Sequence, residues 1–93
     1  MIVGSCQIQL HFPESGSLKD KRRILKSLRE KIRQRFNVSV AEVDDQDLWQ
    51  KAILGVAVVA NDGRFVNQVL SQVVSLVERE AGVLLLDYEM EIG

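Results

Sequence analysis

The residues of this chain best suited to chemistry are nine lysine and arginine side chains between Lys19 and Arg35. Ammonium and guanidinium groups bind phosphates and carboxylates, and each phosphate that they neutralise releases counterions. The remainder of the chain is acidic. Residues 1–40 carry nine basic and three acidic residues, residues 41–93 carry three basic and ten acidic ones, and the formal net charge is −1. This asymmetry predicts a surface for an anionic partner.

Most of these cations share one flank of a predicted helix. Six of them fall within an arc of about 120° beside the apolar residues of the segment, and we call them the basic stripe: Lys19, Arg22, Arg23, Lys26, Arg29 and Arg33. Lys21, Lys31 and Arg35 are predicted to lie on the opposite shoulder. Like charges four residues apart destabilise a helix by about 0.2–0.5 kcal/mol per pair, so helix stability does not explain the cluster. The alternative is a solvated face whose side-chain stems cover the edge of the core.

A second candidate for anion chemistry is the segment PESGS, residues 13–17, between a predicted strand and the start of the basic helix. Backbone N–H groups at a helix N-terminus bind anions such as phosphate. Ser15, Gly16 and Ser17 would supply hydroxyls and backbone amides to such an anion loop. A small phosphate-binding enzyme that uses residues 13–17 is therefore one hypothesis, and an ordinary capped turn is the alternative.

No other group of residues predicts catalysis, a metal centre or a cofactor. Cys6 and His11 are the only cysteine and histidine, so the chain forms no internal disulfide and supplies too few ligands for a zinc site of the usual kind. Cys6 is predicted to point into the core. His11 is predicted to face the other side of its strand, where Glu89 or Glu91 would pair with it. The acidic run at 44–47 lacks the spacing of a calcium loop and is predicted to be a solvated turn.

Six elements follow from the hydrophobic patterns. Residues 1–12, 38–45, 51–60 and 83–92 show strand patterns, and residues 18–36 and 63–81 show amphipathic helices. Ser17 is predicted to cap the first helix, Asn61 or Asp62 the second, and Gly82 to follow the end of the second. The order βαββαβ, with right-handed crossovers, predicts one α+β, ferredoxin-like domain over residues 1–93. Its four-stranded antiparallel sheet has the order 4-1-3-2, with two helices on one face.

The face of this sheet without helices is predicted to be apolar at its centre, where the third strand contributes Ile53, Gly55, Ala57 and Val59. A solvent-exposed apolar patch of this kind favours self-association, and a dimer is the expected homo-oligomer. The alternative is that a loop of the same chain covers the patch. In the last strand, Leu84, Leu86, Tyr88, Met90 and Ile92 are predicted to face the helices. The opposite, open face would carry Leu85, Asp87, Glu89 and Glu91.

Aromatic residues limit how RNA could be read. Proteins of this fold that read single-stranded RNA stack bases on aromatic rings of the open sheet face, which here is predicted to have no ring except that of His11. Structured RNA, bound through its phosphates, therefore fits the basic stripe better. Trp49 lies in the turn between the second and third strands and is predicted to fold back over the end of the core; the alternative is an exposed recognition anchor.

The chain also resembles a known family. The segment SLKDKRRILKSLREKIRQRFNVSVAEVDDQDLWQKAILGVAVVAND is similar to the signature of the bacterial YlxP-like family of uncharacterised small proteins, and the block FNVSVAEVD…DLWQ…LGVAVV is its most specific part. The resemblance implies a small, cytoplasmic, ferredoxin-like protein. It also implies a connection with RNA or the ribosome, because genes of the family lie among those for translation initiation and ribosome maturation. It carries no activity and no site residues.

The function predicted from the sequence is that of a non-enzymatic, cytoplasmic protein that presents its basic helix to an anionic partner, RNA or the ribosome. The alternatives are a protein-interaction module or structural homo-oligomer with an acidic protein partner, and the small phosphate-binding enzyme. The N-terminus lacks the pattern of a signal peptide. The longest apolar run, AILGVAVVA, is shorter than the roughly 20 residues of a membrane-spanning helix. We expect no membrane contact, no cofactor and no small-molecule substrate.

Overall fold

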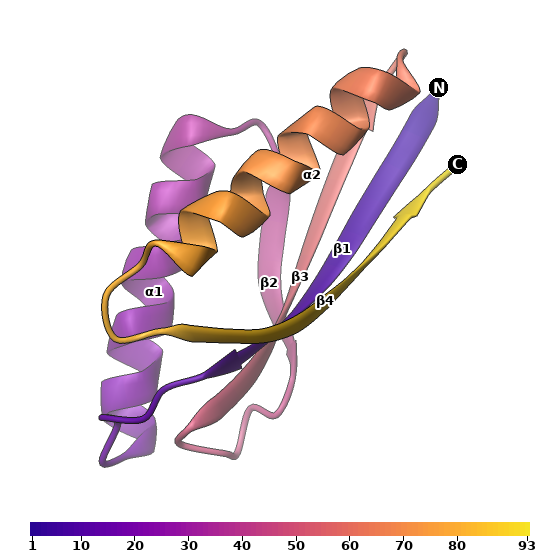
Figure 1. The fold of residues 1–93 in the computed structure, drawn as a ribbon. Helices are drawn as coiled ribbons and strands as arrows, with labels where there is room; N and C mark the ends of the chain where they lie inside the picture. Colours follow the sequence, from indigo (N-terminus) through magenta and orange to yellow (C-terminus); the bar gives the residue numbers. More distant parts are fainter.

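A computed structural model describes all residues from Met1 to Gly93 and confirms the predicted order of elements. These are β1 (Ile2–His11), α1 (Leu18–Arg35), β2 (Ser39–Asp44), β3 (Lys51–Ala60), α2 (Gly63–Glu78) and β4 (Leu84–Ile92). The strands form one antiparallel sheet in the order β2-β3-β1-β4, the predicted order read from the other edge. Both helices pack on one face of it, α1 towards the β2 edge and α2 across β1, β3 and β4 (Figure 1). The architecture is therefore ferredoxin-like, as predicted.

Helix α1 begins where its sequence provides a cap. The Ser17 hydroxyl accepts a hydrogen bond from the Asp20 amide at 3.1 Å, and the Asp20 carboxylate accepts one from the Gly16 amide at 3.2 Å. These bonds satisfy amides that have no partner within the helix. The helix ends at Arg35, because Phe36 turns into an extended conformation. Between these two ends, Leu25, Leu28 and Ile32 face the core, and most of the residues on the outer face are charged.

Helix α2 depends on packing, since its valines are weak helix formers. Asp62, one of the two predicted caps, accepts a hydrogen bond from the Arg64 amide at 3.0 Å. The helix buries seven apolar side chains against the sheet: Val66, Val69, Leu70, Val73, Val74, Leu76 and Val77. Gly4 permits this close approach, because a Cβ atom at that position would overlap Val66 Cγ1. The helix ends at Glu78, so Gly82 lies in the turn before β4, at φ +81°, and not directly after the helix as predicted.

The first part of β4 departs from the predicted alternation. Asp87 pairs with Gln9, but Leu85 and not Leu86 pairs with Leu10, so a bulge inserts one residue. Leu85 therefore turns towards the core, while Leu84 lies opposite His11 on the open face and is 52% exposed. The prediction for Leu84 and Leu85 was wrong because a bulge reverses the two faces of a strand. Beyond it, Asp87, Glu89 and Glu91 occupy the open face as predicted.

Neither helix is long and apolar enough to cross a membrane.

Candidate anion-binding surface

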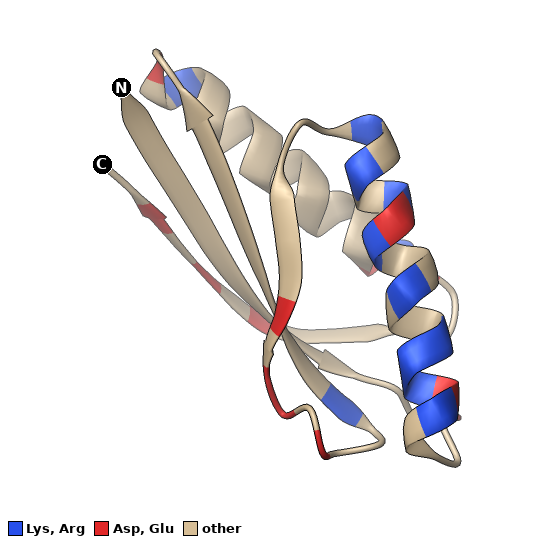
Figure 2. Cartoon of the chain, turned by 180° about the vertical axis from the view of Figure 1, so that it is seen from behind, with Lys and Arg blue, Asp and Glu red and all other residues tan.

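The basic stripe lies along the outer side of α1. Five of its residues are exposed and Arg29 is half-buried. Figure 2 shows blue segments along the whole length of this helix. Its only acidic residues are Asp20 and Glu30. One group of acidic residues lies on β4, at the far edge of the sheet, and a second lies on the loop between β2 and β3, next to the N-terminal half of α1 (Figure 2). The charge asymmetry of the sequence is therefore also an asymmetry of the folded molecule.

The stripe has few internal partners. Arg23 is its only member with a carboxylate within ion-pair distance, Asp20 at 3.9 Å, and both side chains are largely exposed. An exposed pair of this kind contributes about 0–1 kcal/mol and is screened by salt. Arg33 donates to the Val40 carbonyl at 2.9 Å, which orients the guanidinium without neutralising it. The Arg29 Nε is buried and has no hydrogen-bond partner. Most of the positive charge of the stripe is therefore available to an outside anion.

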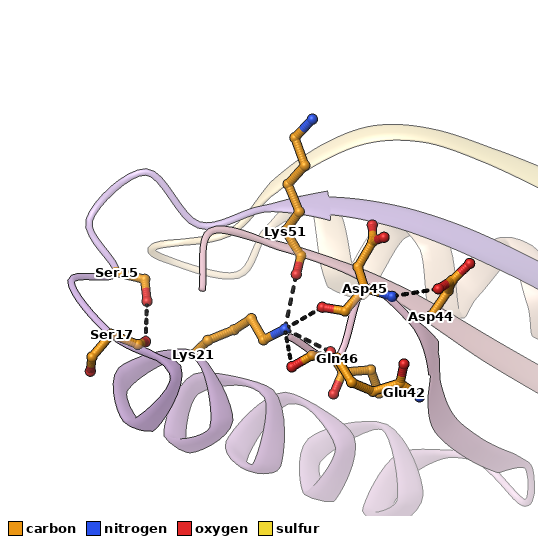
Figure 3. Close-up of polar contacts among 8 residues, drawn as sticks. All are labelled: Ser15, Ser17, Lys21, Glu42, Asp44, Asp45, Gln46 and Lys51. Atoms are coloured by element: carbon orange, nitrogen blue, oxygen red, sulfur yellow. Dashed lines mark hydrogen bonds and ion pairs between the residues drawn. The ribbon is translucent and has the colours of Figure 1, made fainter. Parts of the chain in front are cut away.

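Lys21 is not part of this charged surface. Its side chain is fully buried, and its ammonium donates to the carbonyl oxygens of Asp45 at 2.8 Å, Lys51 at 3.0 Å and Gln46 at 3.4 Å. Glu42 Oε2 lies 2.9 Å from the same nitrogen (Figure 3). The contact with Glu42 is an ion pair and not a directed hydrogen bond, because Glu42 Oε2 is buried without a hydrogen-bond partner.

The position of Lys21 corrects the sequence prediction, which placed it on the shoulder of α1 with Lys31 and Arg35. Lys21 precedes Leu25 by four residues, and Leu25 precedes Leu28 by three, so all three share the buried stripe. That spacing was the available signal; lysine type alone argued against burial. The residue holds the loop from Asp45 to Lys51 against the N-terminal half of α1, where Asp45 adopts a left-handed φ of 63°. The loop is therefore shaped by a tertiary contact.

The opposite shoulder of α1 meets α2. Lys31 Nζ lies 2.6 Å from Glu80 Oε1 just beyond the end of α2, which joins the two helices. Arg35, one turn further along α1, forms no ion pair. These two cations therefore face a neighbouring helix, whereas the basic stripe faces outwards.

The candidate anion loop at residues 13–17 uses its polar groups internally. Ser15 is buried, its amide donates to the Phe12 carbonyl at 3.1 Å, and its hydroxyl donates to the Ser17 carbonyl at 3.0 Å. The Gly16 amide donates to the carboxylate of Asp20, and the Ser17 hydroxyl caps α1. A carboxylate thus already occupies the donor that an incoming phosphate would need. This geometry favours the capped turn, and we take the enzyme hypothesis no further.

The predicted self-association residues all lie on the helix-free face. Val59 pairs with Val3 of β1, and both are exposed, Val59 to 61%. Ala57 is exposed beside them, while Ile53 and Gly55 are partly covered. Val43 of β2 lies over Gly55, where an added Cβ would come within 2.8 Å of its Cγ1. The open face is therefore apolar at one end, with acidic side chains along β4.

Three further residues can now be placed. Trp49 is 52% exposed, so the prediction that it covers the core was wrong. The loop to which it belongs is held against α1 by Lys21, and the Trp49 side chain stays largely in solvent. His11 pairs with Leu84 and Lys51, whereas Glu89 lies opposite Gln7, so the predicted pairing of His11 with Glu89 or Glu91 does not form. Cys6 is buried as predicted, and burial raises the pKa of its thiol to about 11.

Comparison with known proteins gives a family without an activity. A family model described as "Protein of unknown function (DUF503)" matches residues 3–90. The chain is 30% identical over 77 residues to "Uncharacterized protein YlxP" of Bacillus subtilis (strain 168), which covers 83% of this chain and 84% of that protein. The de novo designed protein Ferredog-Diesel has a TM-score of 0.52 at 11% identity over 96% of this chain and 83% of its own, and this likeness shows the fold alone.

Proposed function

The chain belongs to the DUF503 family, as its resemblance to YlxP-like proteins predicted, and we propose that it is a non-enzymatic protein that binds structured RNA through the basic stripe of α1. The observation that supports this proposal most directly is that five of the six cations lack a carboxylate partner. Folding alone does not require this arrangement, because like charges on one helix flank oppose helix formation.

Phosphates are the expected contacts. The stripe runs along a single helix, so its guanidinium and ammonium groups can contact successive phosphates without reading base edges. The open sheet face carries no aromatic ring except that of His11 and is acidic along β4, which argues against stacking of single-stranded bases there. A structured RNA, such as a ribosomal RNA helix, is therefore the partner that the charge distribution favours, and a cytoplasmic location follows from such a partner.

The test is the affinity for a fluorescein-labelled RNA hairpin, measured by fluorescence anisotropy at several salt concentrations. The wild-type affinity should fall steeply with salt, by about 0.7–0.9 logarithmic units of affinity per logarithmic unit of salt for each phosphate contacted. The double variant Arg22→Glu/Lys26→Glu should bind at least about tenfold more weakly, with a salt slope shallower by about two.

A matched control variant separates the effect of the basic stripe from the effect of net charge. Lys51→Glu/Arg64→Glu makes the same change in charge at two exposed cations outside α1, and the Lys51 side chain points away from that helix (Figure 3). It should retain most of the RNA affinity. Equal losses in the two double variants, or an affinity independent of salt, would contradict the proposal. Stronger competition by polyglutamate than by RNA would favour the alternative, an acidic protein partner.

The cellular form of the partner can be tested by co-sedimentation with ribosomes. The wild-type protein should sediment with ribosomes from a cell extract, ribonuclease treatment should release it, and Arg22→Glu/Lys26→Glu should remain in the supernatant. Capture that resists both ribonuclease and high salt would instead indicate a protein contact.

We further propose that the protein forms a homodimer through the open sheet face. Val3 and Val59 are exposed opposite each other on neighbouring strands, and Ala57 beside them allows close approach. The mass from light scattering should be that of a dimer, and Val59→Asp should give a monomer that remains folded. A monomeric wild type at high micromolar concentration would refute this.

A further inference from the structure

A polar cleft lies between the C-terminal ends of α1 and α2, on the shoulder of α1 away from the basic stripe. Its volume is about 520 Å³, within the range of roughly 300–1,000 Å³ that is usual for small-ligand sites. It is lined by Arg35, Phe36, Gln72, Ser75 and Arg79. Four of these five side chains are polar or cationic, so the cleft suits a polar ligand.

The two helices place these side chains together for a local reason. Gln72, Ser75 and Arg79 follow one another at spacings of three and four. Gln72 and Ser75 therefore share one exposed side of α2, and Arg79, the residue directly after its end, continues that side. Arg35 is the last residue of α1, and the chain then turns extended at Phe36. Phe36 is half-buried against the core and also lines the cleft, so it gives the cleft its one apolar residue.

The charges around the cleft are unbalanced. Two carboxylates flank Arg79 in the chain, Glu78 and Glu80, and neither forms an ion pair with it. Glu80 is bound by Lys31 at 2.6 Å. Neither Arg35 nor Arg79 forms an ion pair, and the side chains of Gln72 and Ser75 make no hydrogen bond within the protein. Two arginines and two neutral side chains that can donate hydrogen bonds thus line one cleft, and none of the four has a side-chain partner within the protein.

We propose that this cleft binds the phosphate group of a nucleotide. Two guanidinium forks match the oxygens of one phosphate, the Gln72 amide and the Ser75 hydroxyl add donors, and the Phe36 ring offers a surface to a base. The nucleotide is either a free mononucleotide or a residue of an RNA chain that also lies on the basic stripe. Only the second case rests on the proposed function.

The test is an NMR titration of nitrogen-15-labelled protein, in which the chemical shifts of backbone amides are measured. AMP is added in one titration and a short RNA oligonucleotide in another. Amides of Gln72, Ser75 and Arg79 should shift on binding. Arg35→Gln/Arg79→Gln should weaken the binding by at least about tenfold, because each charged hydrogen bond to phosphate that is lost is a strong one. Arg64→Gln removes an exposed arginine from the first turn of α2 and should change the affinity less than about twofold. Far-UV circular dichroism verifies that the variants are folded.

Each outcome decides the inference. Binding of AMP that depends on Arg35 and Arg79 supports it and assigns a free nucleotide; binding of RNA alone with the same dependence supports it and assigns a polynucleotide. Unmoved cleft resonances with both probes, or an affinity unchanged in Arg35→Gln/Arg79→Gln, overturn it. If AMP does not bind, RNA binding that is lost in Arg22→Glu/Lys26→Glu but kept in Arg35→Gln/Arg79→Gln overturns the inference and leaves the proposed function standing. The reverse pattern overturns the proposed function and supports the cleft.

Discussion

Replacing Lys21 by methionine removes a buried ammonium and keeps an unbranched, apolar stem of similar length. The carbonyls of Asp45, Gln46 and Lys51 then lose their side-chain donor, and Glu42 keeps a carboxylate, only 16% exposed, without a counter-charge. Loop carbonyls that turn inwards to reach Lys21 have no equivalent partner in the folded state. The loop should therefore loosen, and the free energy of unfolding should fall.

The magnitude follows from what is left behind. Removal of one partner from a buried ion pair costs about 3–5 kcal/mol, because the other charge stays desolvated. Partial opening of the loop to water would keep the loss near the lower bound. A domain of this size has about 5–15 kcal/mol of stability, so the variant should fold with a reduced margin. Its Tm should fall by on the order of 20 °C.

Urea denaturation measures this loss, and the chain provides its own local probe. Trp49 is the only tryptophan and lies in the loop that Lys21 holds. Its fluorescence should become more accessible to iodide in Lys21→Met under native conditions, while far-UV circular dichroism stays native. The matched control is Lys26→Met, an exposed lysine of the same helix, which should change the stability by no more than about 0.5 kcal/mol.

A second variant measures the cost of leaving the Glu42 carboxylate without its counter-charge. Adding Glu42→Gln to Lys21→Met removes the unpaired carboxylate and should recover about 1–2 kcal/mol. A loss below about 1 kcal/mol in Lys21→Met, or one no greater than in Lys26→Met, would show that the ammonium does not hold the loop. Failure of Glu42→Gln to recover any stability would show that the carboxylate is not desolvated in the variant.

Two further predictions concern the core. Gly4→Ala should cost about 1–3 kcal/mol in urea denaturation, because the new methyl group overlaps Val66 Cγ1 and lies 3.1 Å from Leu70 Cδ1. Gly63→Ala is its control, since a Cβ there meets nothing within 4 Å, and an equal loss in the two variants would refute the packing account. Cys6 should react with a thiol reagent at about pH 8 only after unfolding, and rapid labelling of the native protein would contradict its burial. Because the pKa of the folded thiol is raised from 9.0 to about 11, its contribution to stability is present below pH 9 and is lost as the pH rises towards 11.

The order of elements, the sheet topology and the position of the basic stripe could all be predicted from the sequence. Each depends on local patterns: alternation in β1, a continuous apolar run in β3, a 3.6-residue pattern in α1 and α2, and caps at Ser17 and Asp62. Connection rules then leave few topologies for the order βαββαβ. The stripe follows from the same helical wheel, because a residue that misses the apolar side of a surface helix faces water.

The misplaced residues share a different cause. Lys21, Trp49 and the first residues of β4 depend on contacts between segments far apart in the chain. Lys21 is buried because carbonyls from the β2–β3 loop, 24 to 30 residues further on, surround its ammonium. Leu85 faces the core because the pairing of β4 with β1 contains a bulge.

Amino-acid patterning alone thus determined which faces are apolar, which helix is basic, and which architecture buries the apolar faces while it exposes the basic residues. Tertiary structure alone decided which cation is buried, where the β2–β3 loop presents Trp49, and which two arginines share a cleft. The physical reason is that periodicity acts over one or two turns of chain, whereas the burial of a charge or the meeting of two helix ends depends on groups that only the complete fold brings within hydrogen-bonding distance.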